Sequence, residues 1–487
     1  MLNFWGRRPS PSSRFSPTRP MFRLSANDVV PLSSCYEGFI CTGATGSGKS
    51  SGAMSVIIDS LLKAGVGMLV LTAKNEYGEW ARRCRQWGRE RDLIRVAPNG
   101  HKLDVLQIAL SMPGGSDEAA ASNLDVLVDV GSRTSHSGVG ESYWVQGNAK
   151  NYRRVIALAR MGCDSPSLRD LARIFPTLPA NPKEAQSEEW LNGKFAGQCM
   201  VRATTKLREG KLSPSDAQKL HQVGDWIEEW SALAEKTRSI FLSLATGVLD
   251  QFVFGEAGEM VSAGRSTFSL DSILNDGGIA VVDYPSLVYG SPARFAQIAL
   301  KTLFQQAILR RRMGPDTVPV AVVADEYQEF VTPSLDCAFQ AVARSARGIS
   351  CYATQTIPVL ITALGGGPKA EKEVEALVAN LQTRFAGQNT CPHSNDFFSR
   401  LCGEHRETMY GGSAQLGEFD LVGHMMGGEA KVTSSYSEQY RPQFPAWRFA
   451  QLAKGGPAFG HVVEAVAMQG GRVWSNGRTW MVARFRQ

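Results

Sequence analysis

Gly43-Ala44-Thr45-Gly46-Ser47-Gly48-Lys49-Ser50 decides the fold of this 487-residue chain. The stretch matches the pattern GxxxxGK[ST], whose glycines let successive backbone N–H groups converge on a phosphate. The apolar run 38–42 leads into it, and the residues after Ser50 repeat apolar side chains at helical spacing through Met54, Ile57 and Leu61. A strand, a glycine-rich loop and a helix in this order form a phosphate cradle, with the positive end of the helix dipole at the anion.

The loop residues have the chemistry that a nucleoside triphosphate and its metal ion require. The Lys49 ammonium can reach the β- and γ-phosphate oxygens, and the Ser50 hydroxyl can bind Mg²⁺. We therefore expect ATP and Mg²⁺ as cofactors. The residues expected to contact ATP are Gly43, Thr45, Gly46, Ser47, Gly48, Lys49, Ser50 and Ser51.

A second motif is an apolar strand that ends in two carboxylates, Val320-Ala321-Val322-Val323-Ala324-Asp325-Glu326. Asp325 can hold Mg²⁺ through water, and Glu326 can orient and polarise the attacking water. A base in this position separates an ATPase from a nucleotide sensor. Together with the phosphate loop, the pair predicts an ATP hydrolase with Lys49 and Glu326 as catalytic residues.

Three further polar residues lie around the next apolar strand, 349–353. Gln355 follows this strand and is the candidate sensor of the γ-phosphate. Arg344, and as a second choice Arg347, precede it and are candidates for an arginine that a neighbouring subunit inserts to neutralise transition-state charge. Each of the three has a plain alternative, as a structural amide or a surface or DNA-facing arginine.

The order of elements predicts an α/β sheet domain interrupted by helices. Strands are expected at 38–42, 66–71, 93–96, 279–284, 320–324, 349–353 and 384–387, with helices such as 76–87 and 293–312 between them. Strand signals nearly vanish between 112 and 252, where helical patterns dominate. We expect a nucleotide-binding domain from 26–111 and 253–487, an inserted, mainly helical domain over 112–252, and an exposed loop at 423–436.

Composition bounds the class of protein. A content of 43% hydrophobic and 20% charged residues is that of a globular chain, and no stretch has the roughly 18 to 20 unbroken apolar residues of a membrane span. Residues 1–25, with five arginines among serines and prolines, are expected to be a flexible basic arm, either solvated or able to touch DNA or anionic lipid. The net charge of +6 is modest, so any DNA site must be local.

The nine cysteines show no disulfide-like framework, which fits a reducing cytosol. Cys391, His393, Cys402 and His405 fall within a short window, but their spacing departs from the paired motifs of structural zinc sites. A structural use of these side chains and a zinc site both remain open.

In its motifs and their order, the chain resembles the type IV coupling proteins of the TraG/TraD type, a group of P-loop DNA-pumping ATPases. Further segments that resemble the family are Glu141-Ser142-Tyr143-Trp144, Lys236-Thr237-Arg238-Ser239-Ile240, Leu249-Asp250-Gln251-Phe252, Ala379-Asn380-Leu381-Gln382-Thr383-Arg384-Phe385 and the ending from Gly455 to Arg486. The resemblance implies a RecA-like core with an all-α domain, assembly into a homo-hexamer, and movement of DNA toward a secretion channel.

Two features depart from the family pattern. Typical members have transmembrane helices before the phosphate loop, whereas some 40 residues precede it here. The family often has an acidic residue and a proline before the lysine that ends the second strand, and this chain has Leu71-Thr72-Ala73-Lys74. From the first departure we expect a cytoplasmic protein with no transmembrane segment of its own, either free or peripheral at the cytoplasmic face of the inner membrane.

The resulting functional expectation is an ATP-driven DNA translocase that delivers DNA or a nucleoprotein to a type IV secretion or conjugation channel. Its expected partners are DNA of either strand type, a relaxase or effector, and components of the channel. The alternatives are a secretion-channel ATPase acting on protein, a DNA packaging or segregation pump, and a non-motor substrate receptor whose assembly is controlled by nucleotide.

Overall fold

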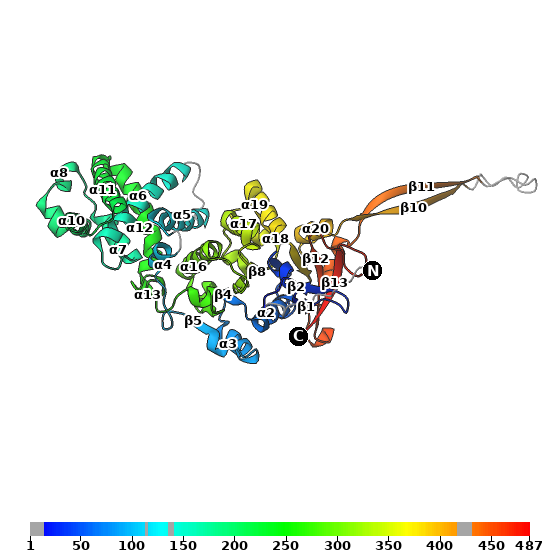
Figure 1. The fold of residues 1–487 in the computed structure, drawn as a ribbon. Coiled ribbons are helices and arrows are strands. Elements are labelled where there is room, and N and C mark those ends of the chain that lie inside the picture. Colours follow the sequence, from blue (N-terminus) through cyan, green and yellow to red (C-terminus); the bar gives the residue numbers. More distant parts are fainter. Residues whose placement is uncertain (1–13, 113–114, 135–140, 416–430) are drawn as a thin grey trace, which may run out of the picture.

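A nine-stranded sheet forms the centre of the computed structural model, which describes residues 14–112, 115–134, 141–415 and 431–487 (Figure 1). The strand order is β13-β12-β9-β3-β8-β7-β4-β6-β5. The seven strands from β9 to β5 are parallel, and β12 and β13 extend one edge in antiparallel pairing. The strands are β3 (Phe39–Thr42), β4 (Gly67–Leu71), β5 (Leu93–Val96), β6 (Ile279–Val282), β7 (Val320–Ala324), β8 (Gly348–Thr354), β9 (Thr383–Gly387), β12 (Val462–Gln469) and β13 (Trp480–Arg486).

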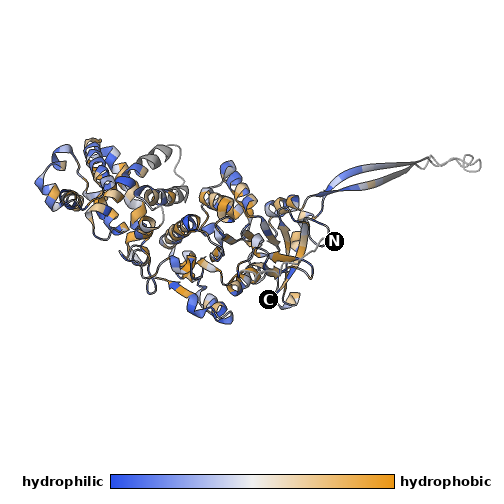
Figure 2. Cartoon of the chain, in the orientation of Figure 1, coloured by the Kyte–Doolittle hydropathy of each residue, from blue (hydrophilic) through white to orange (hydrophobic). Residues whose placement is uncertain are grey.

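The central strands are short apolar runs because both faces of the sheet are covered. Every residue of β7 is buried, and its side chains alternate between two cores. Val320 and Val322 face one core, and Ala321 and Val323 face the other. Figure 2 shows these strands as hydrophobic segments inside more hydrophilic helices. A continuous apolar run of this length is typical of a parallel sheet between helical layers.

Helices pack on both faces of the sheet. Helices α2 (Ala53–Ala64) and α3 (Tyr77–Gln86) share the core of Ala321, and α16 (Ser291–Arg310) and α17 (Pro333–Ala343) share the core of Val322. The predicted strands and the helices near 76–87 and 293–312 are thus present. The remaining elements of this domain are α1 (Leu32–Cys35), α4 (Val105–Ser111), α14 (Asp271–Leu274), α15 (Ser286–Tyr289), α18 (Ile357–Ala363), α19 (Gly367–Asn380), α20 (Pro392–Leu401), and the 3-10 helices η1 (Glu90–Asp92), η3 (Tyr327–Glu329), η4 (Ala446–Gln451) and η5 (Pro457–Phe459).

The segment between β5 and β6 forms a helical lobe at one end of the molecule (Figure 1). Its helices are α5 (Asp117–Thr134), α6 (Glu141–Gly162), α7 (Leu168–Ile174), η2 (Phe175–Thr177), α8 (Pro182–Ala185), α9 (Glu188–Gly193), α10 (Phe195–Arg208), α11 (Pro214–Ala232), α12 (Glu235–Val253) and α13 (Gly255–Val261). Among the described residues, no single helix has the length and apolarity of a membrane span, and only the pair α12 and α13, bent by 81°, meets that test when taken together.

Part of the segment expected to be a flexible arm is ordered. Strands β1 (Pro20–Arg23) and β2 (Val29–Pro31) form a small antiparallel sheet, and Phe15 and Phe22 are buried in the core beneath α2. The expectation of a flexible arm is therefore wrong for residues 14–25, because aromatic side chains anchor the polar sequence. Residues 1–13 lie outside the described residues.

A long β-hairpin projects from the sheet domain at the end opposite the helical lobe (Figure 1). It consists of β10 (Glu404–Gln415) and β11 (Lys431–Pro442), which pair only with each other. The prediction of a loop at 423–436 is wrong for its last residues, 431–436, because they belong to β11. Its earlier part, up to residue 430, lies outside the described residues.

Candidate active site

The phosphate loop lies at the carboxyl end of β3, between the ends of β8 and β9. The Gly43 backbone N–H donates to the Gln355 carbonyl at 3.2 Å, and the Ala44 N–H donates to the Gln388 carbonyl at 2.9 Å. The strands on both sides of β3 therefore fix the start of the loop. In a parallel sheet this edge collects the residues that follow each strand, and ligands bind there.

Two glycines of the loop have left-handed backbone conformations. Gly46 has φ 74° and Gly48 has φ 80°. A Cβ at Gly48 would lie 2.4 Å from the Val463 side chain, whereas nothing lies within 4 Å of a Cβ at Gly46. Gly48 is thus required both by its backbone and by the close approach of β12, while the open side of Gly46 leaves room for a ligand.

Lys49 turns back over the loop. Its ammonium donates to the carbonyls of Gly43 at 2.8 Å and Ala44 at 3.3 Å. Burial lowers the pKa of Lys49, and the nearby carboxylates of Glu326 and Asp325 oppose that shift. The ammonium and the open N–H groups of the loop form a cationic cradle, which fits the phosphates of ATP.

The two residues expected to bind Mg²⁺ are in contact. The Ser50 hydroxyl donates to Asp325 Oδ2 at 2.5 Å, although the two residues are far apart in sequence. A hydroxyl and a carboxylate beside a phosphate loop are oxygen ligands of the kind Mg²⁺ prefers, and the ion usually keeps several waters as well. Ser50 and Asp325 therefore fit the metal ion that accompanies ATP.

The expected base, Glu326, lies beside this pair and is almost buried, with 7% of its side chain exposed. Its carboxylate accepts hydrogen bonds from Lys74 at 2.6 Å, Gln328 at 2.8 Å and Gln355 at 3.1 Å. The structure thus brings the expected sensor Gln355 into contact with the expected base.

Two carboxyl groups at this edge, those of Glu326 and Glu76, have shifted pKa values. Burial alone would raise the pKa of Glu326, but the hydrogen bonds from Lys74, Gln328 and Gln355 outweigh it and lower that pKa. Glu76, at the start of α3, has its pKa raised to about 8 by burial and then by the charge of Asp325. Glu76 and Asp325 line the same small pocket beside Ser50. A cation bound there would favour the ionised form of Glu76.

The two arginine candidates lie at the opposite edge of the sheet from the phosphate loop of their own chain. Both precede β8, whereas Gln355 follows it. The Arg344 side chain is 70% exposed and lies 3.4 Å from Glu37. Arg347 instead donates to the carbonyls of Pro315 and Thr317, at 3.0 and 2.6 Å.

Sequence reasoning missed three residues of the site: Lys74, Glu76 and Gln328. Lys74 and Glu76 follow β4, the neighbour of β7 in the sheet, and Gln328 lies in η3. The signal that could have found them is their position after strands whose carboxyl ends lie at the same edge of the sheet as the phosphate loop. Of the remaining expected ATP contacts, Thr45 is exposed, Ser47 is buried, and the Ser51 hydroxyl accepts from the Gln487 side chain at 2.6 Å.

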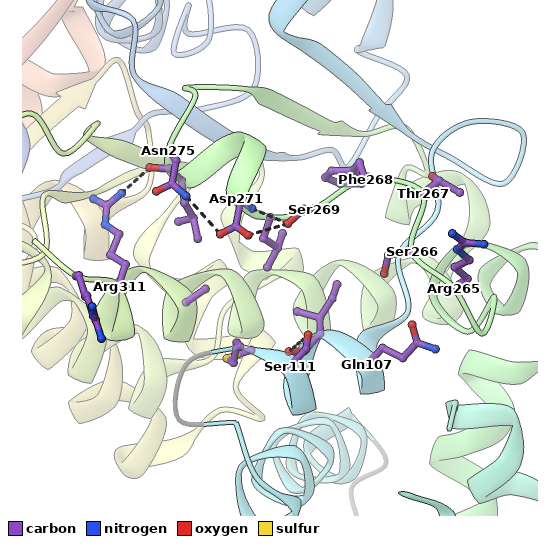
Figure 3. Close-up of a pocket in the computed structure, with 16 residues that line it drawn as sticks. Gln107, Ser111, Arg265, Ser266, Thr267, Phe268, Ser269, Asp271, Asn275 and Arg311 are labelled. Atoms are coloured by element: carbon purple, nitrogen blue, oxygen red, sulfur yellow. Dashed lines mark hydrogen bonds between the residues drawn. The ribbon is translucent and has the colours of Figure 1, made fainter. Parts of the chain in front are cut away.

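A second hollow, of about 750 Å³, lies away from the phosphate loop between α4, α14 and the end of α16 (Figure 3). Its walls combine apolar side chains with polar ones, which include Gln107, Ser269, Asp271 and Arg311. Arg311 uses its guanidinium to bind the carbonyls of Leu274, Val318 and Ala346. This hollow contains none of the residues of the candidate active site.

The cysteine and histidine window does not form a metal cluster. Across the described ranges, no three His, Cys, Asp or Glu side chains are placed to hold a metal ion together. Cys402 is buried, with its sulfur 3.8 Å from that of Met468. The structural use of Cys402, one of the two open readings, agrees with this packing.

A family model described as the TraM recognition site of TraD and TraG matches residues 319–454. This span begins just before β7 and includes Asp325, Glu326, Gln355 and the β10–β11 hairpin. No curated protein sequence matches the chain significantly.

Solved structures of a conjugative coupling protein have the same fold over nearly the whole chain. The trigonal form of the bacterial conjugative coupling protein TrwBdeltaN70 in complex with sulphate aligns with a TM-score of 0.61 and 16% identity, covering 96% of this chain and 90% of that one. The plasmid coupling protein TrwB in complex with ADP and Mg²⁺ aligns with a TM-score of 0.59 at the same identity and coverage, and its complex with the ATP analogue ADPNP with a TM-score of 0.60. The expected fold, a RecA-like P-loop core with an inserted all-α domain, and the resemblance to type IV coupling proteins are confirmed.

Proposed function

We propose that the chain is an ATP-driven DNA translocase, a coupling ATPase that delivers DNA or a nucleoprotein to a type IV secretion or conjugation channel. The observation that carries this proposal is the meeting of Lys49, Asp325 and Glu326 at one edge of the sheet. The fold shared with coupling proteins supports the choice of DNA as the load. In this arrangement six copies surround a channel, with one ATP between each pair of neighbours.

The residues of the site divide the chemistry of hydrolysis among them. The loop N–H groups and Lys49 bind the β- and γ-phosphates, and Ser50 and Asp325 hold Mg²⁺, which supplies charge neutralisation when bound. Glu326 orients a water molecule and takes its proton as the water oxygen bonds to the γ-phosphorus and the bond to the β-phosphate oxygen breaks. Gln355 touches Glu326 at 3.1 Å, so it can report the state of the phosphate to β8.

Arg344 is proposed as the residue that one subunit supplies to the next. Its own phosphate loop lies at the far edge of the sheet, so it can act only on a neighbouring site. Its guanidinium is largely exposed and has one long contact, whereas Arg347 is held by two carbonyls. The exposed arginine is therefore the better candidate to stabilise transition-state charge in trans.

The remaining parts of the proposal concern partners and place of action. A relaxase or effector and components of the secretion channel are the expected protein partners, and the DNA strand type is left to experiment. We place the protein in the cytoplasm, peripheral at the inner membrane, where such a channel opens.

The decisive experiment is the rate of ATP hydrolysis without DNA, with single-stranded DNA and with double-stranded DNA, together with the mass of the assembly in the presence of ATP. We expect DNA of one type to raise turnover several-fold and the mass to be that of a hexamer. Lys49→Ala should lower turnover by about 100-fold or more, because a preorganised charge on the phosphates is lost. Lys63→Ala, at the other end of α2, is the matched control. In the same assay Arg344→Ala should lose hydrolysis and Arg347→Ala should keep it.

Each alternative has its own signature in these measurements. Full hydrolysis by Lys49→Ala would refute the assignment as a P-loop ATPase. Stimulation by a protein substrate and by no DNA would identify a secretion-channel ATPase acting on protein. Nucleotide binding without turnover in the wild type would identify a receptor whose assembly is set by nucleotide.

A further inference from the structure

Lys74 is a charged residue at the site to which the proposed chemistry gives no role. It follows β4, whose last residue Leu71 pairs with Ala324 at the end of β7. Its ammonium lies 2.6 Å from Glu326 Oε1, and the lysine side chain is 53% exposed where the glutamate is 7% exposed. The ion pair therefore links two unlike partners. The Lys74 ammonium is free to move, whereas the protein encloses the Glu326 carboxylate.

The contacts of Glu326 occupy both of its carboxylate oxygens. Oε1 accepts from Lys74, and Oε2 accepts from Gln328 and Gln355. Because donors occupy both oxygens, the carboxylate must give up a contact before it can orient a water molecule and take its proton.

The backbone conformation of Glu326 indicates that surrounding interactions hold this residue in place. Glu326 has φ 57° and ψ 50°, a left-handed conformation. For a residue with a side chain this conformation is unfavourable. Such outliers at a functional site persist only where surrounding interactions hold them. Release of the carboxylate would therefore also allow this backbone to relax.

Lys74 lines the same small pocket as Ser50 of the phosphate loop and Asp325. Burial is the main cause that lowers the pKa of Lys49, and the charge of Lys74 adds to it, so both ammonium groups act on the same region. The four-carbon stem of a lysine is flexible, and its ammonium is a compact charge. A γ-phosphate bound at Lys49 would compete with Glu326 for the ammonium of Lys74.

We propose that Lys74 is a positioning residue that holds Glu326 away from the attacking water until DNA or a neighbouring subunit moves the lysine ammonium onto the γ-phosphate of bound ATP. The inference rests on the proposed hydrolysis of ATP and adds its regulation. Lys74 thereby keeps turnover low in the resting subunit, and DNA or a neighbouring subunit raises turnover by favouring the exchange. Of the three donors to Glu326, Lys74 is the one that carries charge, so it has the greatest effect on the base.

The test is steady-state hydrolysis by the Lys74→Met variant of the whole chain, with and without DNA, over a range of ATP concentrations. Without DNA we expect kcat to rise on the order of 2- to 5-fold, the range that loss of one partly exposed ion pair gives, with KM unchanged within about twofold. The ratio of DNA-stimulated to basal rate should fall correspondingly.

Two variants accompany this one. Lys74→Arg keeps the cation and should retain the low basal rate. Lys372→Met, at an exposed position on α19, should match the wild type in every respect. Thermal midpoints establish that each variant is folded, and Lys74→Gln replaces Lys74→Met if the latter is not.

A basal kcat that stays the same or falls in Lys74→Met, or that rises as much in Lys74→Arg, would overturn the proposal. These basal rates are measured without DNA. A wild type that hydrolyses ATP but ignores DNA would therefore refute the translocase and leave the role of Lys74 decided by the basal rates of the two variants. A wild type that hydrolyses no ATP at all would refute both.

Discussion

Glu76 is the active-site residue whose ionisation should measurably change the stability of the folded chain. Its pKa in the folded chain is about 8, against an ordinary value of 4.5, owing to burial and then to Asp325. Folding therefore takes up a proton between these two pH values, and the contribution of Glu76 to stability is complete below about pH 4.5 and is lost as pH rises through about 8.

The substitution Glu76→Gln should remove this pH-dependent loss of stability, because an amide does not ionise. We expect the thermal midpoint of the nucleotide-free wild type to fall between about pH 5 and about pH 9 by several degrees more than that of the variant. Glu371→Gln, at an exposed position on α19, should keep the wild-type pH dependence. If the thermal midpoint falls equally with pH in Glu76→Gln and in the wild type, Glu76 is not the group responsible for the pH dependence.

The active-site residues that could be predicted from sequence are those whose motifs are local. Lys49 and Ser50 fall in one loop, and Asp325 and Glu326 end one strand, so residue type and spacing were sufficient. The contact between Lys74 and Glu326 joins residues 252 positions apart. It depends on β4 lying beside β7, and strand order is set by tertiary packing that no local pattern encodes.

At the scale of elements, the β10–β11 hairpin stands apart from the rest of the fold. Its two strands pair only with each other, and its described side chains are exposed apart from partly covered Glu407, with Tyr410 86% and Tyr436 75% exposed. Such a ribbon adds little to the stability of the domain, since an isolated two-stranded hairpin is itself marginally stable in water.

Replacing residues 406–440 by a short glycine-serine turn should therefore leave the core intact. We expect a change in thermal midpoint of no more than about 2 °C, the effect of altering exposed surface. Basal ATP hydrolysis should stay within about twofold of the wild-type rate, since none of the hydrogen bonds described above for Lys49, Ser50 and Glu326 involves the hairpin. The matched comparison is Trp480→Ala, which removes a buried residue of the adjacent edge strand and should lower the midpoint markedly. A shortened chain that unfolds as early as Trp480→Ala would show that the hairpin is part of the core.

Elements differ in how well the sequence predicted them. The buried parallel strands were found because each is an apolar run between helical patterns, as in β7. The strands of the hairpin were missed because their exposed residues alternate polar types without an apolar face. The strand β1 was missed for a related reason, since Phe22 is one aromatic anchor within a basic, polar segment.

At the scale of the whole molecule, the helical lobe and the sheet domain share one hydrophobic core. Buried residues of the lobe such as Trp226 and Leu249 belong to the same cluster as Val322 of the sheet. A hydrogen bond of 2.6 Å from Gln306 of α16 to Asn123 of α5 also crosses between them. We therefore expect the inserted helices and the nucleotide-binding domain to unfold together.

Leu249→Ala tests this coupling, because Leu249 is fully buried in α12. The variant should lose about 2–5 kcal/mol of stability, as large-to-small substitutions in cores do. In calorimetry its single transition should move to lower temperature as a whole, and ADP with Mg²⁺ should raise that transition in both proteins. Leu244→Ala, on the same helix at a position 36% exposed, is the control and should shift the transition little. Two separate transitions, with the lower one insensitive to nucleotide, would contradict the shared core.

The length of the β10–β11 hairpin makes it a mechanical amplifier. Twelve residues in each strand carry its far end roughly 40 Å from where it leaves the sheet domain. A tilt of about 10° at that base would sweep the far end through roughly 7 Å, by simple lever geometry on that length. Angular changes of the catalytic core too small to detect at the base would thus appear as large displacements of a fluorophore carried at Gln415, the last residue of β10.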